Sequence, residues 1–300
     1  MKEVMSKNKR QQLVIERIQE FFDQIFALKS SDTMRQYLEF CARMPNHSTF
    51  NSTLVFIQKP SCFYYATKTQ WEKRFNRKPK PFARPLLILF PFAPVEFVYD
   101  LEDIDGEPLA EKDLTHWWIE EKGGISKEKF ENLIKLCEEL HIKTSIAPSD
   151  YLHKEGHKTF GIAYRKLDDN KRGIELHPRY NDPKELQEAF GVLVHEIAHH
   201  LLGHIGELKT RVETKNASKE IVLAKDGRGN DRSVIEVEAE LTAWLLFSKY
   251  GIAKKSAAYL AGWITKQNAK SARIAEVCKA TDNIYKMSDG KRWWLKKVSK

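Results

Sequence analysis

The sequence predicts an α+β protein with two domains: a mixed α/β domain over residues 1–145 and a mostly helical domain with a small sheet over residues 146–300. The chain has 300 residues, of which 42% are hydrophobic, and this is enough for two domains with cores of their own. Helical and strand-like patterns occur in both parts of the chain. A turn-rich segment, Ala147-Pro148-Ser149-Asp150, indicates a boundary near residues 141–155.

In the first part, apolar residues at helical spacing predict helices over residues 13–29, 32–44, 69–75 and 126–140. Residues 86–91 and 95–100 predict two strands, and Asp105-Gly106 predicts a turn after them. Two further segments, 54–58 and 62–66, are rich in apolar and aromatic residues.

The second part predicts two strands, over residues 159–166 and 173–177, joined by a polar turn at 168–172. Helices are expected over residues 183–203, 233–249, 254–265 and 268–287. Residues 207–232 are polar and contain Gly227, Gly229 and Asn230, so a mobile loop is expected there.

The composition favours a reduced, cytoplasmic protein. None of the four cysteines (Cys41, Cys62, Cys137 and Cys278) lies in a C-x-x-C pair, and the polar N-terminus has no apolar signal segment. The longest apolar run, residues 86–99, is broken by prolines and is too short for a membrane span, so no membrane partner is expected. A net charge of +9 favours an anionic partner, most often nucleic acid.

The segment His195-Glu196-Ile197-Ala198-His199 predicts a zinc site. Asp182 as N-cap, Pro183 at the first helical position and Glu185 closing a capping box predict the start of the helix that carries it. Residues at i and i+4 share one helix face, so both imidazoles can bind one Zn²⁺. The glutamate between them is the candidate general base, which takes a proton from water and passes it to a leaving amine. The alternative is a helix with two half-exposed histidines on one flank.

A third zinc ligand is expected from Glu236-Val237-Glu238-Ala239-Glu240, at the start of a later helix. Glu236 and Glu240 share a face, so one can bind the metal while the other accepts a hydrogen bond from a ligand histidine. Glu238 is rotated away from that face. The alternative is a solvated acidic helix start that the helix dipole favours. Leu202 and Ile205 exclude a metzincin site, which needs glycine and histidine there.

Cations and aromatic residues alternate between residues 63 and 84, as they do where single-stranded nucleic acid is bound. The side chains expected to contact it are Lys68, Trp71, Lys73, Arg74, Arg77, Lys78 and Lys80. The alternative is a basic loop whose aromatic residues belong to the core. Residues 254–300 hold twelve Lys and Arg against three acidic residues, which predicts a second nucleic-acid contact, a membrane-surface contact or a solvated end.

Taken in order, these residues resemble the ArdC-type antirestriction proteins of mobile elements, whose zincin domain is related to ImmA/IrrE-type metallopeptidases. The resemblance covers most of the chain, and only the metal motif is specific by itself. It rests on the segments Tyr37-Leu38-Glu39-Phe40, Phe50-Asn51-Ser52-Thr53-Leu54, Gln58-Lys59-Pro60, Ala66-Thr67 with Trp71, the metal motif, Glu236 with Glu240, and Ala258-Tyr259-Leu260-Ala261-Gly262-Trp263.

The resemblance implies that His195, His199 and Glu236 bind Zn²⁺, that Glu196 is the general base and that Glu240 supports a ligand from behind. It also implies that the first domain binds single-stranded DNA. Here the chain departs from the family pattern, because residues 75–81 (FNRKPKP) stand where relatives often have a glycine-rich basic turn.

Three functions are compatible with these residues. The chain is a protease that DNA brings to its protein or peptide targets, an antirestriction protein that shields DNA and uses zinc structurally, or a regulatory protease that cuts a repressor. The sequence leaves the peptide substrate, the nucleic-acid preference and the oligomeric state open.

Overall fold

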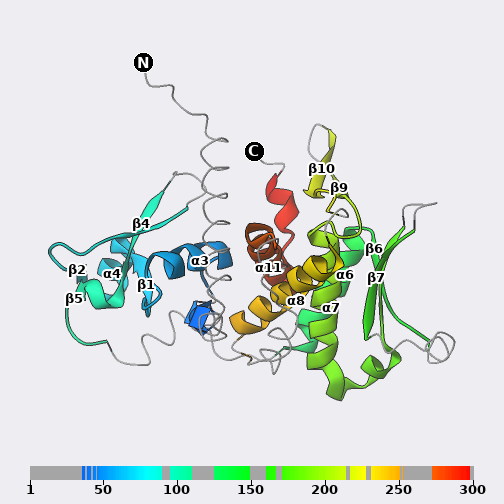
Figure 1. Ribbon diagram of the computed structural model, residues 1–300, viewed down its shortest axis with the longest axis horizontal. Coiled ribbons are helices and arrows are strands. Elements are labelled where there is room, and N and C mark those ends of the chain that lie inside the picture. Colours follow the sequence, from blue (N-terminus) through cyan, green and yellow to red (C-terminus); the bar gives the residue numbers. More distant parts are fainter. Residues whose placement is uncertain are drawn as a thin grey trace. The chain divides into compact units, whose positions relative to one another are not determined.

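The computed structural model has the expected α+β architecture (Figure 1). It describes residues 36, 37, 39–41, 43, 44, 46–89, 95–109, 125–148, 160–166, 171–213, 217–227, 231–250, 252 and 272–297. The chain divides into two compact units, one of Met1–Gly123 with Ser248–Ala257 and the other of Gly124–Phe247 with Ala258–Lys300. The helices expected over residues 13–29 and 254–265, the polar turn centred on 168–170 and the resemblance segment 258–263 lie outside the described residues.

The first unit is built around a small antiparallel sheet in the order β1-β4-β3. Its described elements are α3 (Thr49–Gln58), β1 (Tyr65–Thr67), α4 (Lys68–Phe75), β2 (Lys78–Pro79), β3 (Leu86–Ile88), β4 (Glu96–Asp100) and β5 (Ile104–Asp105). The strands expected over 86–91 and 95–100 are therefore confirmed as β3 and β4, and β2 pairs with β5. Helix α4 begins with a capping box between Thr67 and Gln70.

A buried carboxylate ties the elements of the first unit together. Asp100, at the end of β4, is fully buried, and its Oδ2 lies 2.6 Å from the Lys59 ammonium that follows α3. Its Oδ1 accepts a hydrogen bond from the backbone N–H of Phe63, just before β1. A buried charge is tolerated only when it is paired in this way, so this contact fixes the ends of three elements.

The sheet of the second unit has the order β6-β8-β7, with β6 (Ile142–Ile146) parallel and β7 (Gly161–Arg165) antiparallel to β8 (Arg172–Leu176). Helix α6 (Lys127–Glu139) leads into β6 and packs against other helices of this unit. The division of the chain therefore falls at residues 123 and 124, earlier than the boundary expected near residue 145, because β6 pairs with β8 rather than with the first unit.

The core of the second unit is formed by helices α7 (Leu186–Leu201), α8 (Arg232–Lys249) and α11 (Ile274–Ser288). Helix α7 contacts β7 and β8 on one side, and its Phe190 ring meets Phe247 of α8 at a centroid distance of 6.0 Å on the other. In Figure 1, α7 accordingly lies between the sheet and α8. Both helices were expected from the sequence, within three residues at each end.

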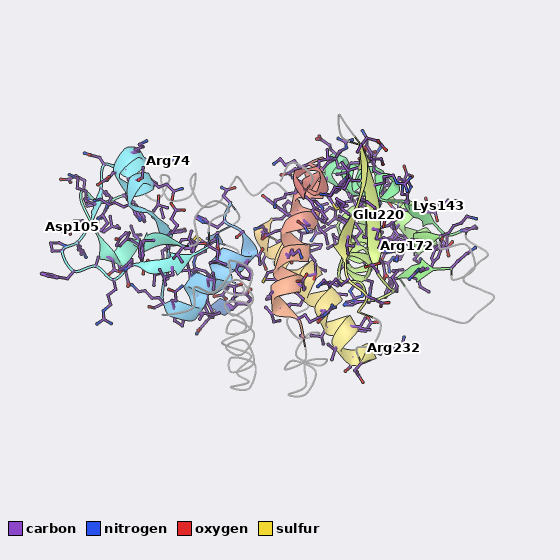
Figure 2. All side chains as sticks on the ribbon, turned by 90° about the horizontal axis from the view of Figure 1, so that it is seen from above. Arg74, Asp105, Lys143, Arg172, Glu220 and Arg232 are labelled. Atoms are coloured by element: carbon purple, nitrogen blue, oxygen red, sulfur yellow. The ribbon has the colours of Figure 1, made fainter. Side chains whose placement is uncertain are left out.

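The expected mobile loop over residues 207–232 is wrong for most of its length. The structure has an antiparallel hairpin there, with strands β9 (Leu208–Glu213) and β10 (Ser218–Ala224); Figure 2 labels Glu220 on it. Leu208, Thr210 and Val212 are buried and alternate with exposed residues, so the segment buries one face of a ribbon. This period-two pattern was present in the sequence and outweighs the polar composition.

The start of α7 differs slightly from the expected capping box. Asp182 does cap the chain, since its Oδ1 accepts a hydrogen bond from the Lys184 backbone N–H at 2.9 Å, but a 3₁₀ turn over Pro183–Glu185 precedes the α-helix. Glu185 does not close a box, because its carboxylate accepts from Arg179 instead. A charged partner thus outcompetes the backbone amide.

Two expectations from composition can be compared with the structure. All four cysteines are buried thiols, as expected for a reduced protein. Among the described residues, no helix is long and apolar enough to cross a membrane.

Gly203 ends α7 in the left-handed region, with φ +73°, where glycine is strongly favoured. A Cβ there would lie 1.8 Å from the carbonyl oxygen of Lys225. Gly290 has a similar φ of +70°, but its nearest neighbour would be 3.6 Å away. We predict that Gly290→Ala lowers the free energy of unfolding by about 1 kcal/mol. Gly203→Ala should lower it by about 3 kcal/mol or more, because its Cβ would also displace the backbone carbonyl of Lys225.

Urea unfolding of the two variants beside the wild type measures this difference. Equal losses in the two variants would show that the Lys225 carbonyl yields freely and that only the backbone conformation matters.

Candidate functional site

Three side chains from two helices converge in the second unit. His195 and His199 of α7 face Glu236 of α8, and one ligand atom of each lies within 4.8 Å of the others. The two Nε2 atoms are 3.1 Å apart, and Glu236 Oε2 lies 3.4 Å from the first and 3.8 Å from the second. The structure therefore brings together the three residues that the sequence proposes as metal ligands.

These distances fit a small metal ion. A tetrahedral ion with bonds of about 2.1 Å keeps its ligand atoms roughly 3.4 Å apart, and the three separations lie close to that value. The donor set is two imidazole nitrogens and one carboxylate oxygen, which suits a borderline metal ion. His195 and Glu236 are only partly buried, so the group is reachable from solvent.

Glu240, one turn beyond Glu236, holds the first histidine from behind. Its Oε2 lies 3.2 Å from His195 Nδ1, the nitrogen that faces away from the ligand cluster. Burial opposes the charged imidazole, but hydrogen bonds to Glu236 and Glu240 outweigh it and raise the pKa of His195 to about 9. The expectation that one carboxylate of this pair meets the ligand cluster and the other orients a histidine agrees with this geometry.

Glu196 is buried beside the cluster, and a close contact with the sheet sets its position. Burial raises the pKa of its carboxyl group. The positive charge of His195 and a hydrogen bond from the Ala163 backbone N–H lower this pKa, but burial has the larger effect. Gly161 allows β7 to approach α7, because a Cβ at that residue would lie 2.5 Å from Val192 Cγ1 and 3.2 Å from the Glu196 side chain. A carboxyl group with a raised pKa next to a metal-binding cluster can act as a general base.

A second buried chain of contacts, which the sequence reasoning missed, begins at His199. His204 lies just past α7, with its Nδ1 3.0 Å from His199 Nδ1 and its Nε2 2.8 Å from Glu238 Oε2. Arg273 holds the same carboxylate through its Nη2 at 2.6 Å and its backbone N–H at 2.5 Å. Burial lowers the pKa values of both histidines, whereas hydrogen bonds from His204 and Arg273 outweigh burial and lower the pKa of Glu238.

The structure decides against the alternative reading of the acidic start of α8. Glu238 is rotated away from Glu236 as expected, yet it is fully buried, and Glu240 is largely buried too. The alternative of a solvated acidic turn therefore does not hold for these two residues. In the sequence, the burial of Glu238 could have been predicted from its position between the apolar residues Val237 and Ala239, which are also buried.

The remaining histidines lie apart from the ligand cluster or outside the description. His200 is fully buried and its Nε2 lies 3.1 Å from the Gly173 carbonyl oxygen of β8, so it faces the sheet. His177 accepts a hydrogen bond from the Arg179 backbone N–H at a turn. His157 is outside the described residues.

The candidate nucleic-acid residues separate into two groups. Lys68, Lys73, Arg74, Lys78 and Lys80 are exposed on and after α4, and Figure 2 labels Arg74 there. Trp71, by contrast, is 0% exposed and donates its indole N–H to the Tyr99 carbonyl, so it cannot stack on a base. Trp71 is buried because it lies on the inner face of α4.

Two of the cations also serve the fold. Arg77 is half-buried and donates to the Glu107 and Ile104 carbonyls, while Lys80 donates to the Glu102 carbonyl at 2.7 Å. These contacts hold the segment around β2 against the segment around β5. Lys68 also has an acidic neighbour, because its Nζ lies 3.9 Å from Glu72 Oε1 on the same helix. Exposure, rather than the lack of a partner, makes Lys68, Lys73, Arg74 and Lys78 candidates for phosphate contacts.

Exposed aromatic rings do occur in the first unit: Phe82 belongs to the aromatic residues between 63 and 84 that the sequence pointed to, and Phe97 does not. Phe97 is 55% exposed on β4, directly opposite the exposed Leu87 of β3. Phe82 is fully exposed at 102% and adopts φ +67°, an uncommon conformation for a bulky residue. Such rings can stack on nucleic-acid bases, which Trp71 cannot.

No protein-family model and no curated protein matches the chain. Among solved structures, the chain is similar to the antirestriction protein ArdC from plasmid R388, in a metal-free crystal structure and in one with Mn(II) bound. In both cases the identity is 14% and the TM-score 0.45. The alignments cover 92% of this chain and 98% of the metal-free protein, and 90% and 97% for the Mn(II)-bound one. This similarity is too low to assign a chemistry to the site, so its chemistry has to be argued from its own residues.

Proposed function

We propose that the second unit is a zinc-dependent peptidase. The observation that carries this proposal is the convergence of His195, His199 and Glu236 beside the buried carboxyl group of Glu196. Two imidazoles and one carboxylate, with a fourth position left for water, are the ligands of many catalytic zinc sites. The same residues on a purely structural site would more often include a fourth protein ligand.

The chain's own groups divide the work of peptide hydrolysis. Zn²⁺ at this site would polarise the scissile carbonyl and make water more acidic. Glu196 takes the proton of the attacking water and delivers it to the nitrogen of the leaving amine, a role for which its raised pKa is suited. Glu240 keeps the His195 ring oriented toward the metal position.

Strand β7 offers a place for an extended peptide substrate. It lies at the edge of the described sheet, and its Gly161 and Ala163 both touch Glu196. Phe160, just before the strand, and Ile162, within it, each expose about half of their surface. Edge strands bind extended peptides through backbone hydrogen bonds and side-chain contacts, so a protein or peptide substrate fits this position.

We propose that the first unit binds single-stranded DNA. The support is the exposed cations of α4 and β2, together with the exposed rings of Phe82 and Phe97 on the same unit. Cations neutralise phosphates and flat rings stack on bases, which requires no particular base sequence.

The two activities together suit an antirestriction role in the cytoplasm, as the sequence resemblance to ArdC-type proteins implies. In that role the protein acts on incoming DNA of a mobile element and cuts proteins bound to it. A DNA-shielding protein with structural zinc and a regulatory protease that cuts a repressor are the alternatives, and the variants below separate them.

Metal content tests the ligand set. We expect purified protein to hold about one zinc ion per chain, and His195→Ala to hold less than about a tenth of that after dialysis, because two ligands bind far more weakly than three. His177→Ala is the matched control, since this histidine lies outside the cluster. Elemental analysis gives the ratio, and a wild-type protein without metal would overturn the proposal.

Glu196→Gln separates metal binding from catalysis. The change removes the general base and keeps the ligands, so we expect full zinc content with a loss of peptidase activity of about 100-fold or more. Cleavage of a peptide library measures the activity. Undiminished cleavage would exclude Glu196 as the base, and DNA protection that survives the change would favour the shielding alternative.

The double variant Lys73→Glu/Arg74→Glu tests the DNA surface. We expect weaker binding to a labelled oligothymidine. The slope of log K against the logarithm of the salt concentration should become shallower by about 1.4, or 0.7 for each lost phosphate contact. The control is Lys127→Glu/Lys143→Glu, which makes the same change in net charge on exposed residues of the second unit. Equal effects of the two double variants in fluorescence anisotropy would show that net charge alone governs binding.

A further inference from the structure

We propose that His204, Glu238 and Arg273 form a positioning chain that fixes the proton of His199 on Nδ1 and so presents its Nε2 to the metal. This inference rests on the proposed metal site. It assigns a role to three residues outside the ligand set, none of which lies on a helix face that carries the proposed ligands.

The contacts run in one line from the ligand into the core. His199 Nδ1 meets His204 Nδ1 at 3.0 Å, and His204 Nε2 meets Glu238 Oε2 at 2.8 Å. Beyond it, Arg273 donates to Glu238 through Nε at 3.1 Å, Nη2 at 2.6 Å and its backbone N–H at 2.5 Å. The Glu238 carboxylate is thus occupied on both oxygens.

If both imidazoles are neutral, the chemistry of these groups allows a single direction for the hydrogen bonds. The ion pair with Arg273 keeps Glu238 ionised, and a carboxylate can only accept, so His204 must donate from Nε2. A neutral imidazole carries one N–H, so Nδ1 of His204 is left as an acceptor. His199 must then donate from its own Nδ1, which leaves a lone pair on Nε2.

That lone pair faces the ligand cluster. Nε2 of His199 lies 3.1 Å from His195 Nε2 and 3.8 Å from Glu236 Oε2. A metal ion binds a histidine only through an unprotonated nitrogen, so the other tautomer of His199 would have to rearrange before it could bind.

Burial restricts these groups to the hydrogen bonds described above. The side chains of His204 and Glu238 are both 0% exposed, so water does not offer them alternative partners. The chain also joins α7, α8 and the residue before α11, three parts of the second unit that are far apart in sequence. The two ligand histidines are consequently oriented by different means: His195 by Glu240 directly, and His199 by Glu238 through an intervening imidazole.

The test compares His204→Leu with His204→Asn. Leucine removes the acceptor for His199 Nδ1–H, and we expect zinc affinity, measured by competition with a chromophoric chelator, to fall about 10- to 100-fold. Asparagine places its Oδ1 near the former Nδ1 and restores an acceptor, so most of the affinity should return. The control is His200→Leu, which also removes a buried imidazole and its one hydrogen bond, to the Gly173 carbonyl, but leaves the chain intact. It should lower stability without lowering zinc affinity.

Nitrogen-15 NMR of the histidine rings gives a readout that does not depend on zinc. In metal-free wild type we expect His199 to carry its proton on Nδ1, and in His204→Leu to gain a population protonated on Nε2. An unchanged tautomer, or equal loss of affinity in His204→Leu and His200→Leu, would overturn the positioning chain. Failure of the wild type to bind zinc would overturn the proposed function instead, and the tautomer measurement would still decide this inference.

Discussion

The pairing of histidines on and just after α7 with carboxylates of α8 is the interaction on which the second unit depends. His195 meets Glu236 and Glu240, and His204 meets Glu238, so the two helices are joined by polar groups that lie largely out of water. Buried polar groups are costly unless each has a partner, and this requirement fixes both the rotation and the register of the helices. The apolar contact between Phe190 and Phe247 adds area, but it would tolerate small shifts that the polar pairs do not.

In the first unit, besides the buried pair of Asp100 and Lys59, the aromatic side chains differ in how deeply they are buried. Trp71 and Tyr65 lie in the core, while Phe82 and Phe97 remain exposed. Aromatic rings left in water lower stability unless a partner covers them, so their exposure is more informative than their number. A sequence shows how many rings there are, and only the fold shows which of them reach solvent.

Local signals in the sequence predicted helices α4, α6, α7 and α8 and the closeness of His195, His199 and Glu236, whereas α3 was not predicted. The spacing of His195 and His199 and that of Glu236 and Glu240 are properties of a single helix, so i and i+4 reasoning is sufficient for them. Other features depend on residues distant in the chain. His204 and Glu238 are 34 positions apart and meet only because α7 and α8 cross. Strand β6 was missed because its partner, β8, is parallel and follows about 30 residues later, beyond any local pattern.

Arg273 follows the three proposed metal ligands in the chain, so its contacts with Glu238 form after those ligands have been synthesised. This residue donates to Glu238 and, through Nη2, to the carbonyl of Leu202, so it covers the end of α7 and the inner side of the ligand helices at once. During synthesis the metal ligands leave the ribosome well before residue 273 does, and until then Glu238 is a carboxylate without its cation. Zinc affinity should therefore mature only late in translation. On the proposed zinc site, a nascent chain that has all three proposed ligands but lacks α11 should hold the metal more loosely than the complete second unit.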